Sequence, residues 1–302
     1  MASKYKSLAA LGLSTTLLGG LVACSNETAE PAPAPSETAA PETPEAGTST
    51  TADAVATDDS SYVMSGGEGE GEGGEGEGGE GEGGEGGVDI AAAAEDPAVY
   101  RSALAMTEAH IRAGIDALDA GERRAAGEMF AHPVSEILID LEPVLVQQGV
   151  EPFAQKLSDA SAAVFAEESA EDLRARADDI IATLRAAGEK APEGADSSAI
   201  VEAKVVADQI NRAAAQYDSA TRTDAYEPYL DGYGFYSTAS AMLSDDRAAI
   251  EAAAPDFTAQ ADEVLAILAN AYPGAARPEE LDADKSALTA ANSELQLLAS
   301  GL

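Results

Sequence analysis

LAMTEAHIRAGIDALDAG, residues 104–121, carries its large apolar side chains at the spacing of one helix face. These side chains are Leu104, Ile111, Ile115 and Leu118. Gly121 closes the stretch, at a position where glycine commonly ends a helix. The stretch therefore predicts an amphipathic helix.

The same helical period continues on both sides of this stretch, through residues 98–302. Further helices are expected from Glu122, from Pro133 to Gly149 with a kink at Pro143, over 153–164, from Ser169 to Leu184, over 200–217, over 226–242, on both sides of a bend at Pro255, and from Pro278. No segment combines strand alternation with turn residues. We expect an all-α domain, built as an antiparallel helical bundle or as stacked helical hairpins. A possible seam lies near 189–197, because this length of chain can form one large or two small cores.

The N-terminus has the layout of a secretory signal. Lys4 and Lys6 precede an apolar run from Leu8 to Leu18, and Gly19 and Gly20 follow it. This run is shorter than the roughly 20 apolar residues that a membrane-spanning helix requires. We therefore expect residues 1–23 to be a signal peptide and not a permanent anchor.

Leu21-Val22-Ala23-Cys24 resembles the lipobox of bacterial lipoprotein precursors. The resemblance implies lipidation (diacylglyceryl and palmitate-type acyl chains) on Cys24, and cleavage before it. Several acyl chains make a stable anchor, whereas one gives only marginal binding. Ser25 stands where an Asp resembles the inner-membrane retention signal, so the resemblance favours the outer membrane, facing the periplasm. The alternative is an ordinary secretory signal that ends near a cysteine.

Residues 24–97 form the expected disordered linker, rich first in Pro, Thr and Glu and then in Gly and Glu. Residues 66–87 contain only Gly and Glu, a composition that is flexible and swollen by charge repulsion. The simplest interpretation is a spacer between the membrane and the helical domain. Loose collection of Ca²⁺ or Fe³⁺ is the alternative, although the repeat fixes no coordination geometry.

The chain is strongly acidic, with a formal net charge of −38. Nucleic acid is therefore excluded as a partner, since its phosphates would be repelled. The expected partners are the membrane, through the N-terminal lipid, and a periplasmic protein or cationic ligand. A surface that is acidic only for solubility is the alternative.

The sequence contains few groups that support catalysis. Lipidation would consume Cys24, the single cysteine, and there is no Gly-x-Ser-x-Gly motif or phosphate-binding loop. His110 and His132 are the only histidines, and no serine is placed with them. We therefore expect no enzyme and no obligatory cofactor.

The histidines nevertheless suggest a metal site. Glu128, His132 and Glu136 are spaced by four, so a continuous helix would present all three on one face, and His110 could meet them from a facing helix. Histidine with carboxylates suits iron, zinc or manganese. In the alternative interpretation, His132 caps a helix end and His110 is a half-buried flanking residue.

A second candidate site lies in the segment DAYEPYLDGYGFY, residues 224–236. Its tyrosines follow one helical stripe, with two acidic residues between them that could bind a cation. The proposed pocket residues are Tyr226, Glu227, Tyr229, Asp231 and Tyr233. Gly232 and Gly234 would allow a backbone or ligand to approach closely. The alternative is an aromatic core.

The lipobox, the linker, the helical domain and the His/Glu candidates together resemble imelysin-like periplasmic proteins, which are helical and tied to iron handling. Their Gly-x-His-x-x-Glu motif is not reproduced: Glu108 precedes His110 by two, and Ala113 follows it by three. His132 has its acid, Glu136, four residues on. No residue role is carried over. The sequence thus favours a lipid-anchored, ligand- or partner-binding envelope protein, with metal handling as the alternative and an enzyme as a distant third.

Overall fold

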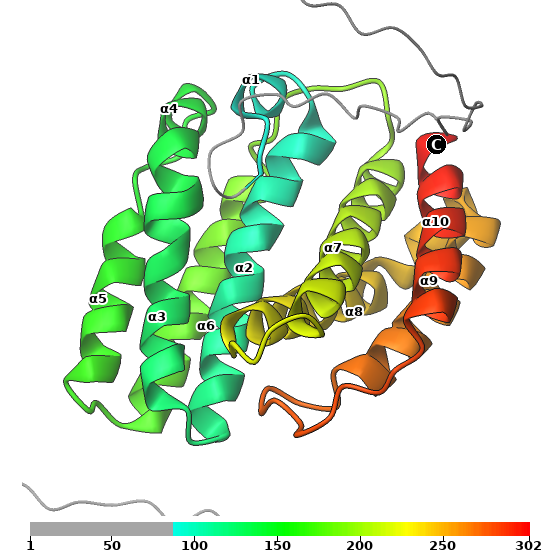
Figure 1. Cartoon of the computed structure of the whole chain (residues 1–302). Helices are drawn as coiled ribbons and strands as arrows, with labels where there is room; N and C mark the ends of the chain where they lie inside the picture. The colour runs from blue at the N-terminus through cyan, green and yellow to red at the C-terminus, as the bar shows by residue number, and fades with distance from the viewer. Residues whose placement is uncertain (1–86) are drawn as a thin grey trace, which may run out of the picture. The chain divides into compact units, whose positions relative to one another are not determined.

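A computed structural model describes residues 87–302, and this part of the chain is entirely helical (Figure 1). Its elements are α1 (Ile90–Ala93), α2 (Pro97–Asp119), α3 (Arg123–Pro133), the π-helix η1 (Val134–Leu138), α4 (Ile139–Gln147), α5 (Ala154–Phe165), α6 (Ala170–Gly188), α7 (Ser198–Ala220), α8 (Glu227–Ala253), α9 (Pro255–Ala271) and α10 (Lys285–Ser300). The expected all-α bundle is confirmed. The signal peptide, Cys24 and the linker up to residue 86 lie outside the described residues.

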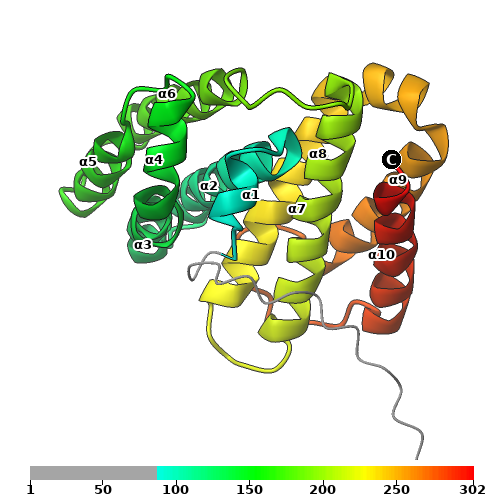
Figure 2. The same cartoon turned by 90° about the horizontal axis from the view of Figure 1, so that it is seen from above.

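Helix α2 is the central element of the bundle. Asp96 begins it by accepting hydrogen bonds from the backbone N–H groups of Ala98 and Val99, and Pro97 occupies its first turn. The helix packs against α3 and α6 on one side and against α7 and α8 on the other (Figures 1 and 2). Because it is covered almost all round, even its polar residues Glu108 and His110 are buried.

Two glycines allow the neighbours of α2 to approach closely. A Cβ on Gly114 would lie 3.2 Å from the Ala126 carbonyl oxygen of α3. A Cβ on Gly234 of α8 would lie 2.5 Å from the Ala109 carbonyl oxygen, which no packed side chain tolerates. Gly234 therefore brings α8 against α2 directly beside His110.

The helices on both sides of the 189–197 loop share one contiguous apolar core. Large side chains such as Phe130, Ile111 and Phe257 are buried within it, and each contributes about 1.5–3 kcal/mol by leaving water. Among the helices that the structure describes, none is both long and apolar enough to cross a membrane.

Several expected boundaries are wrong. The helical part begins before residue 98, because Asp89 caps α1 and Asp96 caps α2. Pro255 does not bend a longer helix: the non-helical Ala254 ends α8 and Pro255 begins α9. Pro278 does not open the last helix, which begins at Lys285 behind the capping side chain of Asp284.

The helix expected from Pro133 is not separate from the one expected from Glu122. The chain stays helical from α3 into α4, and η1 joins them. The wider π turn hydrogen-bonds the Ile139 N–H to the Val134 carbonyl, and π turns of this kind are often found at functional sites. As a result, His132 at the end of α3 and Glu136 on η1 remain on one continuous helical segment.

Candidate metal centre

His110 is held rigidly on α2. Its side chain is only 6% exposed, and the ring of Phe235 from α8 packs edge-on against it. Its Nδ1 lies 2.8 Å from the Met106 carbonyl oxygen. A carbonyl only accepts hydrogen bonds, so Nδ1 carries the proton and donates, and in the neutral ring Nε2 keeps its lone pair. Burial lowers the pKa of His110, which favours this neutral form.

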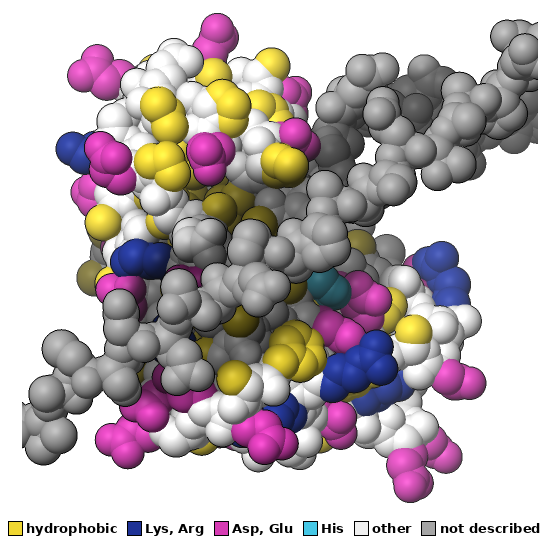
Figure 3. Space-filling view, turned by 90° about the vertical axis from the view of Figure 1, so that its left-hand side faces the viewer, with side chains coloured by type: hydrophobic (Ala, Val, Ile, Leu, Met, Phe, Trp, Pro, Cys, Tyr) yellow, Lys and Arg dark blue, Asp and Glu magenta, His cyan; other side chains and the backbone are white. Residues whose placement is uncertain are grey.

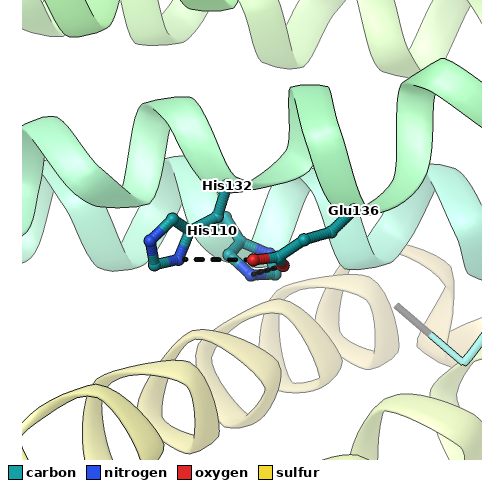
Figure 4. Close-up of side chains that lie close together, drawn as sticks. All are labelled: His110, His132 and Glu136. Carbon is teal, nitrogen blue, oxygen red and sulfur yellow. Dashed lines mark ion pairs between the residues drawn. The ribbon is translucent and has the colours of Figure 1, made fainter. Parts of the chain in front are cut away.

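His132 and Glu136 face His110 from the neighbouring helical segment (Figure 4). The His110 Nε2 is 4.0 Å from Glu136 Oε2, and the His132 Nδ1 is 3.9 Å from Glu136 Oε1. One possible ligand atom from each of the three residues lies within 4.8 Å of the other two. The structure thus brings together three of the four residues that the sequence singles out for a metal site.

Helix α8 adds two carboxylates to this group. Asp231 Oδ1 lies 3.8 Å from His110 Nε2, and Glu227 Oε1 lies 3.6 Å from His132 Nδ1. Asp231 Oδ1 is shielded from solvent and has no hydrogen-bond partner in the described residues. Burial, with a smaller contribution from the nearby charge of Glu227, raises the pKa of the Asp231 carboxyl to about 7.

A pocket of about 240 Å³ opens beside these groups. His110, Glu136 and Asp231 line it together with apolar side chains that include Met106 and Phe235. On the face shown in Figure 3, a histidine side chain reaches the surface next to acidic side chains. The donors are therefore close to solvent on one side and are fixed by the packed helices on the other.

Glu128 does not belong to this cluster. Its carboxylate is on the exposed side of α3, where Oε1 accepts a hydrogen bond of 2.8 Å from Arg124 Nε. The four-residue spacing with His132 would align the two on an ideal helix. In the structure, Glu128 instead forms an ion pair with Arg124, one turn away on the same helix.

The tyrosines of the second candidate site hydrogen-bond to neighbouring parts of the fold. The Tyr226 and Tyr229 hydroxyls donate to the carbonyls of Ala275 and Gly274, and the Tyr233 hydroxyl donates to Asp116 Oδ2. Tyr229 is fully buried against the ring of Tyr272, as the aromatic-core alternative expects. The tyrosines fasten α8 to its neighbours, whereas Glu227 and Asp231 of the same segment face the histidines.

Glu227 and Asp231, which the sequence groups with the tyrosines, lie beside the histidines in the structure. They are spaced by four on α8, as His132 and Glu136 are spaced by four on the facing segment. That matched spacing was the only available signal. It could not reveal that the two segments lie opposite each other.

Comparisons with known proteins add no assignment: no protein-family model, curated protein or solved structure matches this chain.

Proposed function

We propose that the helical domain binds a divalent transition-metal ion through His110, His132 and Glu136, and that the protein handles this metal at the cell envelope. The three side chains supply two imidazole nitrogens and a carboxylate. This donor set suits zinc, iron or manganese, whose sites in proteins mix nitrogen and oxygen ligands. Helical bundles commonly build such sites from facing helices.

The arrangement around His110 carries the proposal. Its Nε2 lone pair faces carboxylate oxygens of Glu136 and Asp231 at 4.0 and 3.8 Å. Acceptors that face each other in a shielded place repel, unless a cation or a proton lies between them. Burial and, to a smaller extent, the charges of Glu227 and Glu136 raise the pKa of Asp231, which favours a proton on this carboxyl. A metal ion would remove the repulsion between the facing acceptors more completely than a proton does, since it attracts all the donors at once.

The backbone contact of His110 supports the same assignment. Metal-binding histidines usually donate their second ring N–H to a carbonyl or carboxylate, which orients the ring and fixes its tautomer. The bond from Nδ1 to the Met106 carbonyl has this form. The ring is therefore oriented for a ligand before one binds.

The experiment is a titration of the full-length chain, purified in detergent and stripped of metal, with Zn²⁺, Mn²⁺ and Fe²⁺. We expect binding in competition with a chelator of known affinity, and loss of binding in both His110→Ala and His132→Ala. Binding that is absent for all three ions, or unchanged in both variants, would refute the proposal. Glu128→Gln is the matched control, because that carboxylate lies outside the cluster on the same helix.

We also propose that acyl chains on Cys24 anchor the domain, with the Gly/Glu-rich linker as its spacer. The lipobox resemblance at residues 21–24 supports this part. The test is the incorporation of a labelled fatty acid into the full-length chain in a bacterial host. The label should be absent from Cys24→Ser, and equal labelling of the two chains would contradict the anchor.

A further inference from the structure

The Glu136 carboxylate lies between the two histidines and uses a different oxygen toward each. Its Oε2 faces His110 Nε2, and its Oε1 faces His132 Nδ1. The two imidazole rings are edge to face, with centroids 6.3 Å apart. Glu136 is thus placed as a bridge between two nitrogen donors.

Each histidine also has a carboxylate of its own from α8. Within 4.0 Å, Asp231 reaches His110, whereas Glu227 reaches His132. Among the described residues, only Glu136 comes this close to both rings. Five donors therefore divide into two matching halves, each with one nitrogen, one private carboxylate and one oxygen of Glu136.

We infer that the site holds two divalent metal ions bridged by the Glu136 carboxylate, an inference that rests on the proposed function. One ion would take His110, Asp231 and Glu136 Oε2. The other would take His132, Glu227 and Glu136 Oε1. The adjoining pocket, which His110, Glu136 and Asp231 line, would supply water to the first ion.

The distances fit this division. Metal–ligand bonds of about 2.0–2.2 Å place two ligands of the same ion about 3–3.5 Å apart. The nitrogen-to-oxygen distances within the halves are 3.6–4.0 Å, so each half needs to contract by at most about 1 Å to reach that spacing. Two ions that share a carboxylate lie about 3.5–4 Å apart, which suits rings whose centroids are 6.3 Å apart.

Charge favours two ions as well. When ionised, Glu136, Asp231 and Glu227 bring three negative charges around the two rings, so one divalent ion leaves an excess of negative charge. A second divalent ion reverses that excess, and a bound hydroxide would then neutralise the centre. A single ion placed between the two histidines would also leave one of the two α8 carboxylates, Asp231 or Glu227, without a metal partner.

Metal stoichiometry on the full-length chain tests the inference. We expect about two Mn²⁺ per chain by elemental analysis after removal of excess metal, with an electron paramagnetic resonance spectrum of exchange-coupled Mn²⁺. One ion per chain with an uncoupled spectrum overturns the two-ion inference but leaves the proposed function standing. No bound ion overturns both.

Two variants separate the halves. Asp231→Asn should lower the stoichiometry from two to one and remove the coupling, and Glu227→Gln should do the same through the other half. Glu128→Gln, which changes a carboxylate paired with Arg124, should keep two coupled ions. If Asp231→Asn and Glu227→Gln both retain two coupled ions, the assignment of the private carboxylates is refuted.

Discussion

His110 Nε2 and Asp231 Oδ1 lie 3.8 Å apart, although they come from the separate helices α2 and α8. The close approach depends on Gly234, one turn beyond Asp231, whose missing side chain lets α8 rest on the backbone of Ala109. The packing of two helices thus creates the geometry in which a nitrogen lone pair meets a shielded carboxylate. In the proposed two-ion centre this pair contributes two of the ligands of a metal ion.

Removal of either histidine should weaken metal binding by at least about 100-fold, the upper range for the loss of an outer-shell partner, since these are direct ligands. His132 is partly exposed, so His132→Ala should fold normally even if His110→Ala is destabilised by its buried position. Chelator competition measures the affinity, and circular dichroism checks the fold. Folded variants that bind as tightly as the wild type would contradict the assignment.

Metal binding should stabilise the domain. A ligand at 100 times its Kd adds about 2.7 kcal/mol if it binds only the folded chain, and this raises the Tm of a domain of this size by about 5–11 °C. Thermal melts with Zn²⁺ and with excess EDTA measure the shift. The shift should be smaller in His132→Ala and persist in Glu128→Gln, and an equal shift in both variants would point to binding elsewhere.

Sequence reasoning reached the fold because helix period and caps are local properties. The apolar face of residues 104–118 and the Ser169 cap need no knowledge of the rest of the chain. At Pro133 the local rule failed, because the chain continues helically through a π turn that joins α3 to α4. The prediction of carboxylates near His132 was incomplete for a related reason. Spacing along one helix favoured Glu128, whereas the second carboxylate near His132 in the structure is Glu227 of α8.

The domain should lose stability in alkali through Tyr100. This buried hydroxyl donates to the Ala187 carbonyl at 3.2 Å and joins α2 to α6. Burial raises the pKa of Tyr100 to about 12, against about 10 in the unfolded chain. The unfolded chain therefore releases this proton first, so the contribution of Tyr100 is fully present below pH 10 and is lost as the pH rises to 12.

The loss amounts to at most about 3 kcal/mol, at about 1.4 kcal/mol per pKa unit. Urea unfolding at pH 9 and pH 11.5 measures it. Tyr100→Phe should be less stable at pH 9 by about 1 kcal/mol, for the lost hydrogen bond, and should lose less stability than the wild type between the two pH values. Other buried tyrosines titrate equally in both chains, so equal losses would show that Tyr100 does not contribute.

Gly234→Ala should both destabilise the domain and weaken the metal site. The added Cβ would lie 2.5 Å from the Ala109 carbonyl oxygen, so α8 must move away from α2. Overpacking of this kind costs about 1–3 kcal/mol. The same movement carries Asp231 away from His110, and a misplaced ligand weakens binding more than the loss of stability alone explains.

Gly188→Ala is the matched control, because a Cβ there meets no atom within 4 Å. Urea unfolding without metal gives the stability of each variant, and metal titration under conditions where both are fully folded gives the affinity. We expect Gly188→Ala to match the wild type in both measurements and Gly234→Ala to fall in both. If Gly234→Ala loses stability but binds metal with unchanged affinity and stoichiometry, Asp231 is not a ligand, because its distance from His110 would then have no effect on the ion.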